Sequence, residues 1–324
     1  MRNKKPPFEI TEAALSDVME ISELVGKISS TQNLSTSPIL RRQNRIRTIY
    51  SSLAIEQNTL SLEQVTAVLS GKRVLAPPKD IAEVKNAYEI YDHLAELKPY
   101  SVDDLLLAHR TMMQGLVREA GEFRSRPVGV VDSKGNVLHF GTLPQYVPTL
   151  MEELVQWTES SPFPLLIKSC VFHYEFEVIH PFADGNGRMG RLWHTLLLSK
   201  WNPLFAWLPI ESIIHDHQPE YYAANAQGEG TVFIEFMLGI IKEALQEAIS
   251  EQPAEKPTMQ SKEEVRWEKI ADFLRTNGTI QNSGVQNLLA VSSATASRIL
   301  NALTKEGKLV KVRSGRYWAY KAAE

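Results

Sequence analysis

Apolar residues recur every three or four positions along much of the chain, with polar residues between them, as in amphipathic helices. The pattern is clearest in residues 15–28, 83–97, 101–116, 147–160 and 233–249. Residues 127–141 differ, because β-branched residues there flank the polar run DSKGN. That run predicts a hairpin with its turn at Lys134-Gly135-Asn136. We therefore expect a mainly α-helical protein that carries one small β-hairpin.

A change of composition near the C-terminus predicts a second domain. Residues 250–262 are polar, contain two prolines and lack periodicity, which is typical of an interdomain linker. Residues 262–324 carry eleven Lys and Arg against six Asp and Glu, a net charge of +5 that leaves −8 for the rest of the chain. The pattern there predicts three helices followed by the strands KLVKV and RYWAYK.

This order of elements resembles a winged helix-turn-helix domain. The resemblance places Ser297, Arg298 and Asn301 on the exposed face of the recognition helix, and Arg313 and Arg316 on the wing. Basic residues in these places suit DNA, but winged helices also dock proteins, and a charge of +5 is modest. DNA and protein are therefore both candidate partners of this domain.

The composition excludes several other classes of protein. The single Cys170 cannot form an internal disulfide, which fits a reducing cytoplasm, and its apolar neighbours predict a buried side chain. No segment approaches the ~20 apolar residues of a membrane span, and no apolar stretch follows the basic N-terminus as in a signal peptide. A net charge of −3 gives no overall attraction to nucleic acid or membrane. We expect a soluble cytoplasmic protein with no membrane partner.

The densest chemistry lies in HPFADGNGRMGR, residues 180–191, directly ahead of the apolar run LWHTLLL. Gly185, Gly187 and Gly190 fit the G-x-G-x-x-G spacing of dinucleotide-binding folds, which requires a preceding β-strand. Here the preceding CVFHYEFEVIH suits a helix, so we reject that fold. The chain also lacks the G-x-x-x-x-G-K-[ST] motif, which excludes a P-loop enzyme.

The residue types of the motif instead predict attack on a nucleotide phosphate. The turn from Asp184 to Gly187 lets backbone N–H groups converge on an anion at the start of a helix, whose dipole adds to the attraction. Arg188 and Arg191 share a helix face and can clamp phosphate oxygens. Asp184 suits Mg²⁺ bound together with phosphates, and His180 can accept a proton near neutral pH. The alternative, a helix-entry turn with an N-cap Asp and a core His, explains fewer of these residues.

The motif resembles the signature of the Fic domain family, H-x-F-x-[DE]-G-N-G-R-x-x-R. Every defined position matches: His180, Phe182, Asp184, Gly185, Asn186, Gly187, Arg188 and Arg191. Most Fic proteins transfer AMP from ATP to a Ser, Thr or Tyr hydroxyl of a protein and release pyrophosphate. The resemblance therefore implies ATP as a substrate, Mg²⁺ as a cofactor, and a target protein or the chain itself as the acceptor of AMP.

The resemblance also implies a role for each side chain of the motif. His180 would deprotonate the target hydroxyl, and Asp184 would hold Mg²⁺. Arg188 and Arg191 would bind the β- and γ-phosphates, while Phe182 would anchor the loop in the core. The α-phosphate region would be cradled by Asn186 and by the glycine amides, Gly185, Gly187 and Gly190.

Two further segments resemble parts of the same family. GEFRSRPVGVV with NVLHF resembles the flap hairpin that aligns the target segment by strand addition. This places Asn136 to His139, with Val137 and Leu138 between them, against substrate or nucleotide. PEYYAANAQGEG resembles the segment that closes the adenine pocket, and only Tyr222 is carried over to that role. Without the resemblance, the two tyrosines are ordinary core residues.

SSLAIEQNTLS, residues 51–61, resembles the inhibitory motif [ST]-x-x-x-E-[GN] of the same family. Ser52 and Glu56 lie four residues apart, on one face of a predicted helix. The resemblance implies that Glu56 pairs with Arg191 and so denies the γ-phosphate of ATP its place. Gln57 stands where Gly or Asn is usual. Taken alone, the pattern is that of a helix with one solvated Glu.

The sequence as a whole predicts a Fic-type helical bundle with a small hairpin flap, followed by a winged-helix domain. The expected parts are a helical region with the inhibitory helix, a Fic core, a linker and the winged helix, at residues 1–98, 99–249, 250–262 and 263–324. The expected function is that of a protein adenylyltransferase inhibited by its own Glu56. A homodimer is one possible assembly.

Two alternatives to this function stay open. A hydrolase could remove AMP from a modified protein, with Glu56 orienting the water, and the sequence does not separate removal from transfer. A transcription regulator could instead sense nucleotide through the Fic site and bind DNA through the winged helix. Sensing, however, does not need the base His180.

Overall fold

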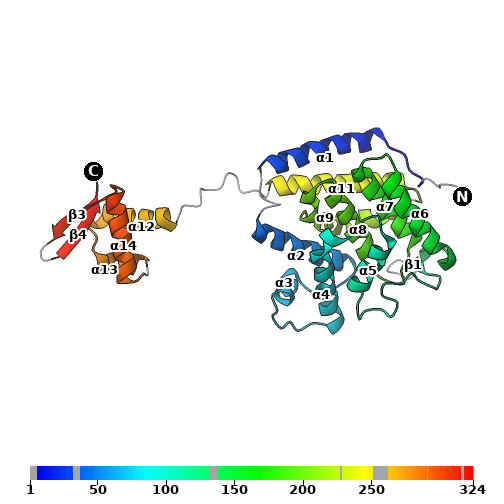
Figure 1. Cartoon of the computed structure of the whole chain (residues 1–324), viewed down its shortest axis with the longest axis horizontal. Coiled ribbons are helices and arrows are strands. Elements are labelled where there is room, and N and C mark those ends of the chain that lie inside the picture. Colours follow the sequence, from blue (N-terminus) through cyan, green and yellow to red (C-terminus); the bar gives the residue numbers. More distant parts are fainter. Residues whose placement is uncertain are drawn as a thin grey trace. The chain divides into compact units, whose positions relative to one another are not determined.

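The chain forms two compact units, residues 1–251 and 252–324 (Figure 1). The computed structural model describes residues 6–31, 37–131, 137–226, 228–250, 262–289, 291–314 and 317–323. Nearly all of the predicted linker, residues 250–262, lies outside these ranges, so its extent stays a prediction. Each unit has its own hydrophobic core, and each is described by itself below.

The first unit is built mainly from helices. Three of the five predicted segments lie within helices, whereas residues 83–97 continue past α4 into η1 and residues 101–116 extend four residues past α5. No helix of the described residues is long and apolar enough to cross a membrane. The helices are α1 (Glu12–Thr31), α2 (Pro38–Ile55), α3 (Leu62–Leu69), α4 (Pro78–Asp92), α5 (Val102–Met112), α6 (Val147–Ser160), α7 (Leu165–Ile179), α8 (Asn186–Trp201), α9 (Ile210–Asp216), α10 (Gln218–Asn225) and α11 (Gly230–Ser250), with the 3₁₀ turns η1 (Leu94–Glu96), η2 (Pro144–Tyr146) and η3 (Pro203–Ala206).

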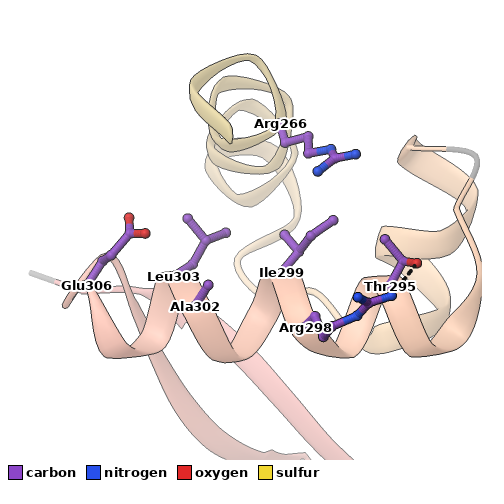
Figure 2. Close-up of a pocket in the computed structure, with 7 residues that line it drawn as sticks. All are labelled: Arg266, Thr295, Arg298, Ile299, Ala302, Leu303 and Glu306. Atoms are coloured by element: carbon purple, nitrogen blue, oxygen red, sulfur yellow. Dashed lines mark hydrogen bonds between the residues drawn. The ribbon is translucent and has the colours of Figure 1, made fainter. Parts of the chain in front are cut away.

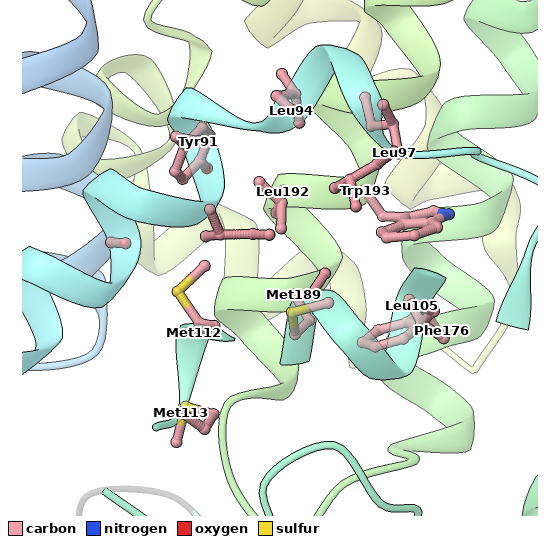
Figure 3. Close-up of a cluster of buried hydrophobic side chains, with 14 of the residues drawn as sticks. Tyr91, Leu94, Leu97, Leu105, Met112, Met113, Phe176, Met189, Leu192 and Trp193 are labelled. Carbon is pink, nitrogen blue, oxygen red and sulfur yellow. The ribbon is translucent and has the colours of Figure 1, made fainter. Parts of the chain in front are cut away.

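Helices α7 and α8 form the centre of this unit and pack against each other. Both are buried on nearly every side, so they lack the one-sided apolar stripe of a surface helix. Figure 3 shows Met189, Leu192 and Trp193 of α8 packed among side chains of α4, α5, α7 and η1. A side chain of this size contributes roughly 1.5–3 kcal/mol when it is fully buried. The loop between α7 and α8, which carries the dense motif, is therefore fixed at both ends by the core.

The predicted hairpin is present as strands β1 (Gly129–Val131) and β2 (Val137–Phe140), which pair antiparallel. Gly129 lies opposite Phe140 and Val130 opposite His139, and the register shifts between Val130 and Val131. The predicted turn, residues 134–136, lies outside the described residues. The N–H of Gly141 donates a hydrogen bond of 3.0 Å to the Val128 carbonyl, which closes the base of the hairpin.

The second unit contains helices α12 (Lys262–Asn277), α13 (Asn282–Leu289) and α14 (Ser293–Lys305), followed by strands β3 (Leu309–Ser314) and β4 (Tyr317–Ala322). The two strands pair antiparallel, and Ile280 forms an isolated bridge with Tyr320. A pocket of about 260 Å³ lies between α12 and α14, and Figure 2 shows Arg266 of α12 across from Ile299 and Leu303 of α14, with Arg298 on the same helix as these two.

Helix α2 ends in a turn whose backbone bears on the unusual residue of the predicted inhibitory motif, Gln57. The N–H of Asn58 donates to Leu53 O and that of Gln57 to Ala54 O, the pattern of a Schellman motif. In this motif the residue after the cap adopts the left-handed conformation, and Gln57 has φ 65°. Gly and Asn adopt that conformation at the lowest cost. The preference of the motif for Gly or Asn thus has a backbone cause.

Gln57→Gly should therefore stabilise the first unit by roughly 0.5–1 kcal/mol, because it removes left-handed strain from an exposed residue and loses no packing. Urea unfolding followed by tryptophan fluorescence would measure the change. Gln57→Val, whose β-branched side chain tolerates positive φ poorly, should lower the unfolding free energy. Equal midpoints for the three proteins would contradict this account of the turn.

Candidate functional site

The dense motif forms a short loop between two buried helices. Helix α7 ends at Ile179, and its C-cap residue His180 has left-handed φ 52° and ψ 62°. Helix α8 begins at Asn186, after Gly185 with φ 86°. The Asn186 side chain donates to Phe182 O and accepts from Phe182 N, both at 2.9 Å. These bonds brace the loop between His180 and the first turn of α8, whose first N–H groups have no acceptor within the helix.

A buried histidine that the sequence analysis did not single out supports this loop from α5. His109 stacks on the Phe182 ring with centroids 3.6 Å apart, and its Nε2 lies 3.0 Å from Asp184 O. Its Nδ1 accepts a hydrogen bond from the N–H of Gly121. Burial lowers the pKa of His109 to about 4, so the ring is neutral with its proton on Nε2. A lone His in an apolar run carries no sequence signal for this position.

Arg191 is fully buried and is bound by the end of α2. Its Nη2 donates to Glu56 Oε1 at 2.7 Å and to Ser52 O at 2.9 Å, while its Nε donates to Ser52 Oγ at 3.1 Å. Burial alone would lower the pKa of Arg191, but the Glu56 carboxylate raises it above its usual value. Its Nη1 makes no hydrogen bond among the described residues. The structure thus brings Ser52, Glu56 and Arg191 together, and it places the buried Tyr221 hydroxyl close enough for Arg191 to lower its pKa.

Gly187 lets Glu56 approach the first turn of α8. A Cβ atom at position 187 would lie 2.3 Å from Glu56 Oε1 and 3.0 Å from Arg191 Nη1. Any side chain there would displace the carboxylate. The glycine of the motif therefore leaves space in which Glu56 lies and in which an anion could bind when Glu56 moves away.

Arg188 is also buried, but its partners differ from those of Arg191. Its Nη1 donates to Glu83 Oε1 and its Nη2 to Asp184 Oδ1, both at 3.1 Å. The two arginines of the motif are thus neutralised by separate carboxylates, and the binding of phosphate by Arg188 stays a prediction. Glu83, on α4, was not found from the sequence, because a Glu on the polar face of a helix is usually solvated.

Asp184 has the features of a Mg²⁺ ligand. Its side chain is half-exposed, and its Oδ1 accepts from the N–H of Gly185 at 2.6 Å and from Arg188. No described residue donates to its Oδ2, and no side chain caps the start of α8, unlike in the helix-entry alternative. The described residues hold no cluster of three metal-ligating side chains. A Mg²⁺ ion here would need phosphate oxygens among its ligands, which suits its known preference.

Glu177 is a buried carboxyl one turn before His180 on α7. Its Oε2 lies 3.9 Å from His180 Nδ1, and its Oε1 has no hydrogen-bond partner among the described residues. Burial raises the pKa of Glu177 to about 8; Arg191 lowers this pKa and Glu56 raises it. The carboxyl is therefore mostly neutral at pH 7. It also lies so close to α8 that a Cβ at Gly190 would be 2.8 Å from Oε1.

The structure places the remaining predicted residues on two elements. Val137, Leu138 and His139 lie on β2, but their side chains are outside the described part, so their contacts stay a prediction. Tyr222 lies on α10, half-exposed, and its hydroxyl donates to Ile55 O at 3.3 Å beside the end of α2. Tyr221 is buried, with its hydroxyl 3.0 Å from His173 Nε2, so the contact of Tyr222 with a nucleotide stays a prediction.

Glu177→Gln should flatten the pH dependence of stability. The folded carboxyl keeps its proton up to about pH 8, whereas its ordinary pKa is 4.5. Its contribution to stability is complete below the ordinary pKa and is lost as the pH rises through the folded pKa, at up to about 1.4 kcal/mol per pH unit. Urea unfolding at several pH values in this range should show that the unfolding free energy of the variant falls less steeply with pH than that of the parent. Glu152→Gln, which changes an exposed carboxyl on α6, should keep the slope of the parent.

Residues 99–198 match the model of the Fic/DOC family. Protein adenylyltransferase fic-1 of Caenorhabditis elegans is 31% identical over 210 residues, which are 59% of this chain and 39% of that protein. A probable protein adenylyltransferase of Aquifex aeolicus is 30% identical over 145 residues, 44% of this chain and 43% of that protein. The chain thus spans about two-fifths of the length of these curated relatives.

A solved structure resembles the chain over a much larger part. The crystal structure of a Fic family protein from Desulfovibrio desulfuricans G20 is 40% identical, with a TM-score of 0.77, and the match covers 98% of both chains. The structure of a Fic domain containing signaling protein from Bacteroides thetaiotaomicron, 24% identical with a TM-score of 0.61, covers 71% of this chain and 96% of that one, and shows the same fold. Because the 40% identity extends over almost the whole of both proteins, the chain belongs to the Fic/DOC family.

Proposed function

We propose that the protein transfers AMP from ATP to a Ser, Thr or Tyr hydroxyl of a target protein or of its own chain. The observation that carries this proposal is the buried Arg191, whose Nη1 lacks a partner beside the first turn of α8. A cation in this setting attracts an anion that can replace Glu56. The names of the distant relatives, both called protein adenylyltransferases, agree with ATP as the source of that anion.

In the proposed reaction, the N–H groups at the start of α8 and Arg191 bind the phosphates of ATP. The target hydroxyl attacks the α-phosphorus from the side of His180, and its proton passes to the imidazole. A bond forms between the hydroxyl oxygen and the α-phosphorus, while the bond to the bridging oxygen breaks and pyrophosphate leaves. Asp184 would hold Mg²⁺, which neutralises phosphate charge when bound.

Glu56 would inhibit this reaction by occupying Arg191. The γ-phosphate of ATP needs the guanidinium to which Glu56 is bonded at 2.7 Å, and the carboxylate repels a triphosphate. ATP would then bind with its γ-phosphate displaced and its α-phosphorus badly aligned for in-line attack. Movement of Glu56 away from Arg191 would relieve this inhibition.

Glu56→Gly should raise covalent labelling by radioactive ATP and Mg²⁺ about tenfold or more, if the pair holds ~1.4 kcal/mol against the reactive pose. Gln57→Gly is the matched control, because it introduces glycine into the same turn, keeps Glu56 and removes the strain at residue 57, so labelling should not rise. Adding His180→Ala to Glu56→Gly should abolish labelling while ATP binding survives, since the base acts on the hydroxyl and not on the phosphates.

The same variants separate transfer from removal of AMP. A protein that removes AMP would lose hydrolysis of an AMP-modified substrate in Glu56→Gly and gain no labelling. Equal labelling and equal hydrolysis in Glu56→Gly and the parent would contradict the inhibitory role. Glu56 would then be an ordinary residue at the end of a helix.

We further propose that the second unit is a winged helix-turn-helix that binds DNA. Helix α14 exposes Ser297, Arg298 and Asn301, and β3 exposes Arg313. Trp318 on β4 is 56% exposed, with the Arg313 guanidinium 5.9 Å from its ring, so an aromatic face and a cation lie together. Such a surface suits phosphates and sugars. Arg316, also predicted on the wing, lies outside the described residues.

Arg298→Ala and Arg313→Ala in the whole chain should each weaken binding to duplex DNA and reduce the slope of log K against log salt by about 1. Fluorescence polarisation of labelled duplex at several salt concentrations would measure this. Arg275→Ala, an exposed arginine of α12 paired with Asp272, is the control and should leave the slope unchanged. Salt-independent or absent DNA binding by the parent would instead favour a docked protein segment, for which the apolar pocket in Figure 2 offers a site.

A further inference from the structure

Arg124 lies between α5 and β1 and has an unusual set of partners for a buried guanidinium. Its side chain is 3% exposed, and it forms no ion pair with any acidic residue of the described part. It donates to four backbone carbonyls instead, those of Arg126, Thr142, Ile179 and His180. Burial lowers the pKa of Arg124. A cation without a counter-ion costs free energy in such a place, so its position needs an explanation.

One set of these bonds lies at the end of α7. Nε donates to His180 O at 2.6 Å, Nη2 donates to Ile179 O at 3.2 Å, and the backbone N–H of Arg124 donates to Pro181 O at 3.0 Å. The last carbonyls of a helix lack partners within the helix, and the negative end of its dipole favours a cation. Arg124 therefore caps α7 at the residue that carries the proposed base.

The backbone of that residue needs such support. His180 has φ 52°, a left-handed conformation that costs a residue with a Cβ roughly 1–2 kcal/mol. Two of the three carbonyls bound by Arg124 here belong to Ile179 and His180, so Arg124 fixes the two peptide planes that flank the Cα from which the imidazole projects.

The other set of bonds lies at the base of the β1–β2 hairpin. Nη1 donates to Arg126 O at 3.0 Å, before β1, and Nη2 donates to Thr142 O, after β2. Gly141 packs directly on the guanidinium, because a Cβ there would lie 2.9 Å from Nη2 and 3.0 Å from Val128 Cγ2. One planar group thus joins both ends of the hairpin to the end of α7.

We propose that Arg124 is a positioning residue that sets the place of the His180 imidazole relative to the hairpin. The hairpin is the segment along which a target strand would align, so Arg124 would bring the base and the attacking hydroxyl into register. The kinetic part of this inference rests on the proposed transfer of AMP, whereas the structural part does not.

The kinetic test compares Glu56→Gly with Glu56→Gly/Arg124→Lys. Lysine keeps the charge, but a single ammonium lacks the planar fork that reaches four carbonyls. We expect kcat for labelling to fall about 10–100-fold, the effect of a displacement near 1 Å, while KM for ATP stays within about twofold. Arg126→Lys, an exposed arginine two residues away, is the control and should leave both constants unchanged.

Chemical rescue tests whether the guanidinium itself is needed. Guanidinium ion, far below denaturing concentrations, should restore part of the kcat of Glu56→Gly/Arg124→Ala, because it fits the space left by the side chain. Urea and ammonium chloride at equal concentration should not. Equal recovery with all three additives would overturn a role for the planar cation.

Two measurements do not depend on activity. In Arg124→Lys the Gly141 amide should exchange with solvent faster than in the parent, while the amide of the buried Leu196 on α8 stays protected. The NMR resonance of the His180 imidazole, identified by its loss in His180→Ala, should shift. If Glu56→Gly shows no labelling, the proposed function fails and these measurements decide the inference alone. An unchanged kcat, an unchanged His180 resonance, or a rise of KM that matches the fall of kcat would overturn it.

Discussion

A guanidinium that is removed from water must be surrounded by acceptors, and Arg191 meets this demand with groups from another helix. Ser52 and Glu56, at the end of α2, supply three of its hydrogen bonds, and Glu56 supplies the charge. The ends of α2 and α8 are thus joined by an interaction that neither helix could make alone. Because one nitrogen remains unpaired, the arrangement is neutral in charge but incomplete in hydrogen bonding. An anion with more oxygens than a carboxylate can compete with Glu56 for the Arg191 guanidinium.

The electrostatics of the site extend beyond this pair, because Arg191 also acts on Glu177. Arg191 lowers the pKa of Glu177 and Glu56 raises it, while burial makes the largest contribution. If Glu56 moved away, Arg191 would lose its main anion and Glu177 would ionise more easily. Ionisation of Glu177, one turn before His180, would then restore part of the negative charge that the site lost with Glu56. An incoming triphosphate would have the opposite effect and would favour the neutral carboxyl.

The parts of the site that the sequence predicted are those that are close together in the chain. Residues 180–191 form one loop and one helix turn, so their spacing alone places His180 near the start of α8. Ser52 and Glu56 lie on α2, and only the resemblance to a family linked them to Arg191. Three supporting residues, Glu83, His109 and Arg124, come from elements 56 to 105 positions away from their partners and have no local pattern. The fold shows a similar division: the segments of α7 and α8 were expected to be helical, but their burial on nearly every side was not predicted, because no local stripe marks it.

The backbone of the turn after α2 sets how firmly Glu56 is held. Glu56 caps the helix, and the left-handed Gln57 follows it in the Schellman turn. A strain of roughly 1–2 kcal/mol at this residue is comparable to the ~1.4 kcal/mol that changes an equilibrium tenfold. The strain is relieved whenever the turn opens, and opening moves Glu56 away from Arg191. A chain with Gln here should thus release the Glu56 carboxylate from Arg191 more readily than one with Gly. Under the proposed inhibition by Glu56, Gln57 would weaken that inhibition through the backbone of the turn.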